Sequence, residues 1–343
     1  MVANALQDRR GVDFARNVAI VAGVVAIICL VLGAPLAALI LMVVGFSAGM
    51  TWEVITRPPP NNPAHFLKRF RELSPPRPVL VCLGDSLTHG RVSDNWTVKI
   101  PPRVAAKMKF DQPAPGDFQD PVWVVNAAQN SITSWTVMRE RLQSALACYP
   151  DYIIVMIGTN DVLSIYSPMA CRDKVKTFLL PEAPTMAGFR RNMTEIVDFL
   201  TKASPKTEVG LCTLPPFGEN LGSEGNKLVK EANEIVHSIV DSHTSDKVSV
   251  LEIGERLQSQ IVQRNDGGKK AMEPMMMMPL QAVQAPLHSL LGASWNSMTF
   301  MSSGCILHDT LHINEDGGDV IADVVTEWLF QKNIHKAIAV KQF

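Results

Sequence analysis

The chain has 343 residues, with 32 Lys and Arg balanced by 33 Asp and Glu, and a formal net charge of −1. This balance, together with the lack of a basic cluster, excludes a nucleic-acid partner held by a positive surface. The six cysteines include no CxxC pair, which argues against a zinc or redox motif. A disulfide between Cys148 and Cys171 is a minor alternative that requires an oxidising compartment.

Residues 1–16 form a polar flank, and the run from Asn17 to Trp52 contains no charged residue over 36 positions. A single membrane-spanning helix needs roughly 20 residues, so residues 17–52 predict a transmembrane segment. Gly33-Ala34-Pro35 divides the run near its middle. One tilted span and a helical hairpin therefore both remain open, and with them the compartment and the side of the membrane. Either way, the prediction is a protein attached to a membrane through residues 17–52.

Residues 53–77 are predicted to be a proline-rich linker. Seven prolines occur between Arg57 and Pro78, including Pro58-Pro59-Pro60. Because proline fixes φ and removes a hydrogen-bond donor, we expect a stiff, extended spacer that does not pack as an element of its own.

From residue 78 onward, strand-like apolar runs alternate with helical patterns, which predicts a mostly parallel sheet with helices on both faces. The predicted strands are residues 78–83, 122–125, 151–157, 207–213 and 248–253. The predicted helices are residues 134–147, 186–202, 223–243 and 317–332. One α/β domain is therefore expected over residues 78–334, followed by a short tail at 335–343.

The regular alternation fails at residues 265–304, where four consecutive methionines, Met275 to Met278, lie between prolines. An insertion of this length is uncommon in a compact domain unless it is functional or disordered. A mobile, low-complexity loop is the preferred interpretation. A lid that contacts apolar substrates through flexible thioethers is the alternative.

A candidate nucleophile, Ser86, directly follows the first predicted strand, and ligands of open α/β sheets bind outside the carboxyl ends of the strands. Acyl transfer also needs a base, a group that orients the base, and donors for the oxyanion. His312, Asp309 and Asn160 could supply these parts. Asp309 and His312 are three residues apart, which lets one turn present both to the same cleft.

Three motifs carry a resemblance to a known family. Gly84-Asp85-Ser86-Leu87, Gly158-Thr159-Asn160-Asp161 and Asp309-Thr-Leu-His312 are similar to the first, third and fifth blocks of the GDSL (SGNH) hydrolases. The resemblance covers residues 78 to 332. It implies a three-layer α/β/α sandwich with a parallel five-stranded sheet, as in flavodoxin-like folds, and a serine esterase or lipase mechanism that uses no metal or cofactor.

The same resemblance implies the site residues. Ser86 would be the nucleophile, His312 the general base and Asp309 the carboxylate that orients it. The oxyanion hole would combine the backbone N–H of Ser86, the side-chain amide of Asn160 and the backbone N–H of Ser131. The family usually has glycine at this last position, so the Cβ of Ser131 restricts φ and narrows the pocket.

These observations together predict a membrane-anchored serine ester hydrolase that acts on a lipid or small acyl ester, with a lysophospholipid as one example. An acyltransferase on the same triad is an alternative within the enzyme class. A catalytically inactive binding module is the alternative from another class, suggested by the altered second block. The acyl chain, the head group and the oligomeric state stay open.

Overall fold

The computed structural model describes residues 22, 25, 27, 30, 31, 33–70, 77–108, 120–264 and 277–341. Within these residues, five strands form one parallel sheet in the order β2-β1-β3-β4-β5, which confirms the predicted sheet and its flavodoxin-like arrangement. The strands are β1 (Val79–Gly84), β2 (Trp123–Asn126), β3 (Tyr152–Met156), β4 (Glu208–Cys212) and β5 (Val248–Leu251). Each lies within two residues of the run that predicted it.

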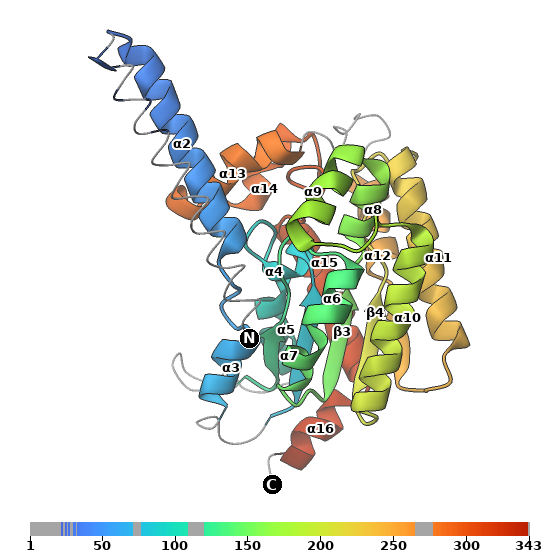
Figure 1. Cartoon of the computed structure of the whole chain (residues 1–343). Coiled ribbons are helices and arrows are strands. Elements are labelled where there is room, and N and C mark those ends of the chain that lie inside the picture. Colours follow the sequence, from blue (N-terminus) through green and yellow to red (C-terminus); the bar gives the residue numbers. More distant parts are fainter. Residues whose placement is uncertain are drawn as a thin grey trace.

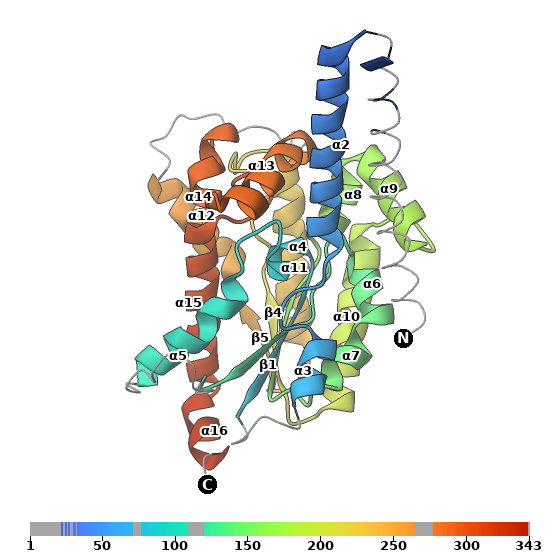
Figure 2. The ribbon, with the colours of Figure 1, turned by 90° about the vertical axis from the view of Figure 1, so that its left-hand side faces the viewer.

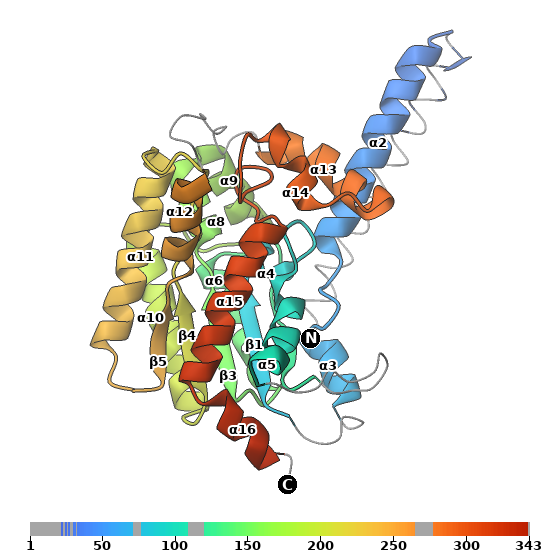
Figure 3. The same ribbon diagram turned by 180° about the vertical axis from the view of Figure 1, so that it is seen from behind.

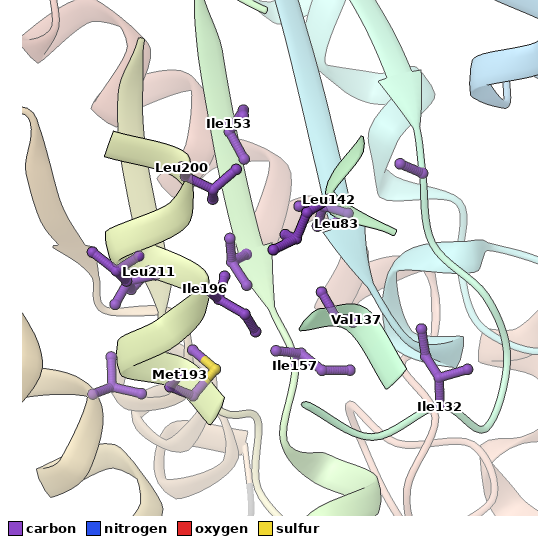
Figure 4. Packing of buried hydrophobic residues seen from close by; sticks show 14 of the residues in the cluster. Leu83, Ile132, Val137, Leu142, Ile153, Ile157, Met193, Ile196, Leu200 and Leu211 are labelled. Atoms are coloured by element: carbon purple, nitrogen blue, oxygen red, sulfur yellow. The ribbon is translucent and has the colours of Figure 1, made fainter. Parts of the chain in front are cut away.

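Six helices that follow β2, β3 and β4 along the chain pack on one face of the sheet (Figure 1). They are α6 (Ser134–Glu140), α7 (Leu142–Leu146), α8 (Thr159–Tyr166), α9 (Pro168–Phe178), α10 (Met186–Ala203) and α11 (Glu224–Ser242). Figure 4 shows the packing, in which Met193, Ile196 and Leu200 of α10 line up beside Ile153 and Leu211 of the sheet. Residues three and four apart share one face of a helix, which is why this stripe is continuous.

The opposite face of the sheet is covered by α5 (Ile100–Met108), α12 (Ile253–Arg264), α15 (Glu315–Gln331) and α16 (Ile334–Lys341) (Figure 3). Successive residues of a strand point to opposite faces, so Leu80 and Cys82 of β1 belong to this second core. Ile338 of α16 is only 1% exposed. The predicted tail at 335–343 thus packs against the domain over its described part.

The predicted extended linker is wrong where the structure describes it. α3 (Pro63–Arg69) begins with proline at its first turn, and the Asn62 side chain accepts a hydrogen bond from the His65 N–H to cap it. Phe66 is buried in the first core, with its ring 6.1 Å from that of Trp123. Residues 71–76 lie outside the described part of the chain.

The predicted irregular insertion is also largely helical. Residues 265–276 lie outside the described residues, and the rest of 265–304 contains α13 (Met277–Leu291), α14 (Trp295–Met298) and a 3₁₀ turn, η3 (Thr299–Met301). Two shorter elements close to the sheet are α4 (Ser86–His89) and the 3₁₀ turn η1 (Trp96–Lys99). α13 lies above the carboxyl ends of the strands, beside α2 (Pro35–Thr56) (Figures 1 and 2).

The chain breaks at Gly33-Ala34-Pro35 as predicted. Gly33 has a φ of 76°, and α2 begins at the following proline. Residues 1–16 and most of residues 17–32 lie outside the described part. Among the described residues, no helix has the length and apolar character needed to cross a membrane, so the predicted span receives no support there. The considered disulfide is absent as well, because Cys148 and Cys171 are both free thiols.

Candidate active site

The site forms at the carboxyl ends of the neighbouring strands β1 and β3, where the strand order of the sheet reverses. Ser86 follows β1 and Asn160 follows β3, so both flank the crevice between these strands. The Asp85 carboxylate caps the short helix α4 by accepting a hydrogen bond from the Leu87 N–H at 3.0 Å. A Cβ on Gly84 would lie 2.8 Å from a β3 carbonyl oxygen, so only glycine lets the chain turn here.

The structure brings the three predicted triad residues together. The Ser86 hydroxyl lies 2.8 Å from His312 Nε2, and His312 Nδ1 lies 2.7 Å from the Asp309 carboxylate. All three are buried: Ser86 is 7% exposed, His312 3% and Asp309 0%. The two contacts form one continuous hydrogen-bonded chain from hydroxyl to carboxylate, the arrangement that removes a proton from a serine nucleophile.

The loop that carries Asp309 and His312 is a tight structure closed by a bridge between Leu307 and Ile313. Asp309 accepts hydrogen bonds from the backbone N–H groups of Leu311 and His312, at 3.1 and 2.7 Å. Burial alone would raise the pKa of the Asp309 carboxyl, but the nearby His312 and His308 and the hydrogen bonds from His312 bring this pKa well below its usual range. Asp309 is therefore an ionised carboxylate held in place to orient the imidazole.

Asn160 lies close to the nucleophile but is tied to its neighbour. The Asn160 side-chain N–H₂ donates to the second oxygen of the Asp85 carboxylate at 3.2 Å. Burial raises the pKa of Asp85 to about 6, against the opposing effect of its hydrogen bonds from Leu87 and Asn160. Asp161, the residue after Asn160, accepts hydrogen bonds from both the N–H and the hydroxyl of Ser134. Asp85 thus caps α4, and Asp161 holds the first residue of α6.

Ser131 lies in the loop after β2 and has a φ of 67°, in the left-handed region. This is the conformation that glycine adopts freely and that a Cβ disfavours. The observation gives a physical reason for the glycine usual at this position, since the loop keeps the backbone shape even though the residue has changed. The role of the Ser131 N–H as an oxyanion donor stays a prediction.

Glu219 is a residue of the site that was not predicted from the sequence. It lies in the loop after β4 and contacts residues 305–307, which lead into the loop of Asp309 and His312. Its carboxylate is 5% exposed and accepts hydrogen bonds from the three successive backbone N–H groups of Cys305, Ile306 and Leu307, at 2.7 to 2.9 Å. The Cys305 thiol lies 3.2 Å from the same carboxylate. The only sequence signal was its place after the carboxyl end of a predicted strand.

One group of side chains in the described part of the chain could hold a metal ion, and it lies away from the triad. His237, Glu252 and Glu255 gather near the surface at α11 and α12, with their ligand atoms within 4.8 Å of one another. Neither the serine, the imidazole nor the carboxylate of the triad belongs to this group.

The sequence profile of the GDSL-like lipase/acylhydrolase family matches residues 82–271, which is more than half of the chain. The chain belongs to this family. It is accordingly a carboxylic ester hydrolase. Asp309 and His312 lie beyond the matched residues, so their assignment rests on the geometry described above and on the fifth-block motif.

Two solved structures resemble this GDSL-family esterase at low sequence identity. An acetyl xylan esterase, AlAXEase, is 15% identical with a TM-score of 0.51, over 73% of this chain and 99% of that chain. A lipase/acylhydrolase from Enterococcus faecalis is 17% identical with a TM-score of 0.46, over 74% and 96%. The comparison with curated proteins gave no match.

The first prediction concerns the backbone at Ser131. Replacing Ser131 by glycine should raise the free energy of unfolding by up to about 1 kcal/mol, because glycine relieves the left-handed strain. Urea denaturation monitored by circular dichroism measures this. Ser259→Gly, at an exposed position of helix α12, is the matched control and should lose roughly 0.5 to 1 kcal/mol. Equal losses in the two variants would contradict the interpretation.

The second prediction concerns Glu219. Glu219→Ala leaves three adjacent N–H groups without their acceptor, so the loop with Asp309 and His312 should shift and kcat for a nitrophenyl ester should fall roughly 100-fold. Glu219→Gln keeps one oxygen and should fall between Glu219→Ala and wild type. Glu234→Ala, at an exposed position of α11, is the control and should leave kcat unchanged. Normal kcat in Glu219→Ala would show that the loop needs no such support.

Proposed function

We propose that this enzyme cleaves carboxylic esters through an acyl-enzyme formed on Ser86. Ser86 Oγ attacks the ester carbonyl carbon while His312 Nε2 takes the hydroxyl proton. His312 then donates that proton to the departing alcohol oxygen, and the C–O bond breaks. A water molecule then attacks the acyl carbon while His312 takes its proton. His312 returns that proton to Ser86 Oγ as the acyl C–Oγ bond breaks, which releases the acid and restores Ser86. The observation that carries the proposal is the continuous chain of contacts, 2.8 and 2.7 Å long, from Ser86 through His312 to Asp309.

The oxyanion that forms during attack needs donors placed before the reaction. We assign this role to the backbone N–H groups of Ser86 and Ser131 and to the side-chain amide of Asn160. The contact of Asn160 with Asp85 supports the assignment of Asn160, because it fixes the amide next to the nucleophile before substrate arrives. Each such donor is typically worth about 100- to 1,000-fold in turnover.

We further propose that the natural substrate is an ester with an apolar acyl chain, presented at a lipid surface to which the N-terminal region attaches. Two observations support this. Residues 17–52 include no charged residue. Large apolar side chains on α2 face outward, among them Leu36 at 70% and Phe46 at 57% exposure. Attachment of this kind concentrates the enzyme where lipid esters are found.

The third prediction tests the nucleophile. Ser86→Ala should abolish hydrolysis of nitrophenyl acetate and nitrophenyl octanoate, and it should also abolish covalent labelling by a fluorophosphonate, while the protein stays folded. Ser259→Ala, on the exposed side of α12, is the matched control and should retain both activities. Full activity in Ser86→Ala would exclude Ser86 from the mechanism. Of the two esters, the octanoate should be hydrolysed with the higher kcat/KM if the substrate is apolar.

The fourth prediction tests the orienting carboxylate. Asp309→Asn keeps the size of the side chain but removes the charge that holds the Nδ1–H of His312, so kcat should fall about 1,000- to 10,000-fold. Asp319→Asn on the surface of α15 is the control, because that carboxylate only pairs with Lys99 and Arg103. A small effect of Asp309→Asn, under about tenfold, would contradict the role assigned to Asp309.

A further inference from the structure

The active site is closed in the described structure. Ser86, His312 and Asn160 are 7%, 3% and 5% exposed. An ester must bring its carbonyl carbon against Ser86 Oγ and its leaving oxygen next to His312 Nε2. At these exposures, little of any of the three side chains faces solvent. Some element that now covers these side chains has to move before any substrate of ordinary size can react.

Besides Ser86 of α4, a residue of α13 contacts His312 from outside the loop that carries it. The side-chain nitrogen of Gln281 lies 2.8 Å from His312 Nδ1 and 3.5 Å from Nε2. The amide nitrogen can only donate, so a hydrogen bond from it needs an Nδ1 without a hydrogen, whereas Nδ1 must carry its hydrogen to donate to Asp309. The same side chain occupies space beside Nε2. Gln281 therefore both blocks the leaving group and opposes the tautomer that catalysis requires.

α13 is fastened to the rest of the enzyme mainly on the far side of Gln281. Gln284, one turn later, is fully buried and donates to the His308 carbonyl oxygen at 2.8 Å, with its own carbonyl oxygen 2.8 Å from His308 Nδ1. The Trp295 ring stacks between His288 and His308, at 4.1 and 4.2 Å. These contacts hold the part of α13 that follows Gln281 and the segment after it.

α13 also packs against α2, which projects past the body of the domain (Figure 2). Both helices carry exposed large apolar side chains: Leu36, Leu39, Ile40, Met42 and Phe46 on α2, and Val283, Leu290 and Leu291 on α13. They form what we call the α2–α13 surface. Exposed apolar side chains gathered on two packed helices are a mark of an interaction site.

We propose that α13 is a lid that keeps the active site closed in water, and that it opens when the α2–α13 surface docks on a lipid layer. Docking engages α2 and the apolar outer side of α13 together, and this withdraws Gln281 from His312. The inference rests on the proposed role of Ser86 and adds a lipid-controlled access step to it.

A lipid layer fits the α2–α13 surface better than a protein partner does. The first 18 residues of α2, Pro35 to Trp52, carry no charged side chain on any face. A protein groove covers one side of a helix and leaves the other in water, where charged or polar side chains are favoured. An apolar medium accepts every side at once. The exposed apolar residues of α2 also occupy more than one face of the helix. Leu36 and Ile40 are four residues apart and share one face, whereas Met42 and Phe46, also four apart, share another.

The experiment measures the rate at which a fluorophosphonate labels Ser86 in the full chain, with and without phosphatidylcholine vesicles. Wild type should be labelled roughly tenfold faster or more with vesicles, because the open form is a minor state in water. Gln281→Ala should reach much of that rate without vesicles. Gln263→Ala, an exposed glutamine on α12, is the matched control and should behave as wild type.

A second variant tests the surface separately from the lid. The double substitution Leu36→Asp and Ile40→Asp should keep the vesicle-free labelling rate and lose the acceleration by vesicles. Equal labelling of wild type in both conditions, or slower labelling of Gln281→Ala, would overturn the lid. Acceleration that follows protein concentration without vesicles would assign the surface to a second copy of the chain and overturn lipid docking. Wild type that is never labelled would overturn the role of Ser86 as well, whereas the other outcomes leave that role intact.

Discussion

The contact between His312 Nδ1 and the buried Asp309 carboxylate is the interaction on which the rest of the site depends. A carboxylate without solvent contact is costly unless hydrogen bonds replace its water. Asp309 solves this with two N–H groups of its own loop and the imidazole. The loop has therefore to keep one shape for the charge to stay buried, and that shape is what aims Nε2 at Ser86. Burial of the charge and alignment of the base are one constraint.

Glu219 repeats the same solution a few residues away. Its carboxylate is also buried, and it accepts hydrogen bonds from three consecutive N–H groups of residues 305–307, which lead into the loop of Asp309 and His312. Because these donors belong to the backbone, they are available only when residues 305–307 adopt one conformation. Glu219 therefore fixes residues 305–307, and Asp309 fixes the loop that follows them up to His312. The buried charges thus act together with the apolar packing of Ile306, Leu307 and Ile313 to position the base.

Local patterns predicted the sheet and the meeting of Ser86 with Asp309 and His312, for a physical reason. A buried parallel strand such as Val79–Gly84 is a short apolar run bounded by turns, so its signal lies within a few residues. The carboxyl ends of such strands share one edge, which carried Ser86 and Asn160 to the same crevice. Glu219 was missed because its partners are 86 or more residues away, and no local pattern encodes such a contact.

Proline misled the sequence analysis in two places. Pro63 lies in the segment predicted to be an extended spacer. It stands at the first turn of α3, where its missing N–H costs nothing and its fixed φ suits the helix. The prolines on either side of the run Met275–Met278 predict an irregular loop, whereas α13 begins at Met277, within that run. Methionine is a good helix former, and the buried contacts of Gln284 supply the tertiary support that the pattern lacked.

The features that hid α13 from prediction are the features a movable helix needs. Pro286 removes one of its hydrogen bonds, and much of its outer side is apolar and exposed rather than packed. Its ties to the domain are mainly polar contacts around His308 and a stacked Trp295. Segments with few buried apolar contacts open at low free-energy cost, and elements that gate a site are drawn from them. A helix packed as tightly as α10 would give a clear sequence pattern and a site that stays shut.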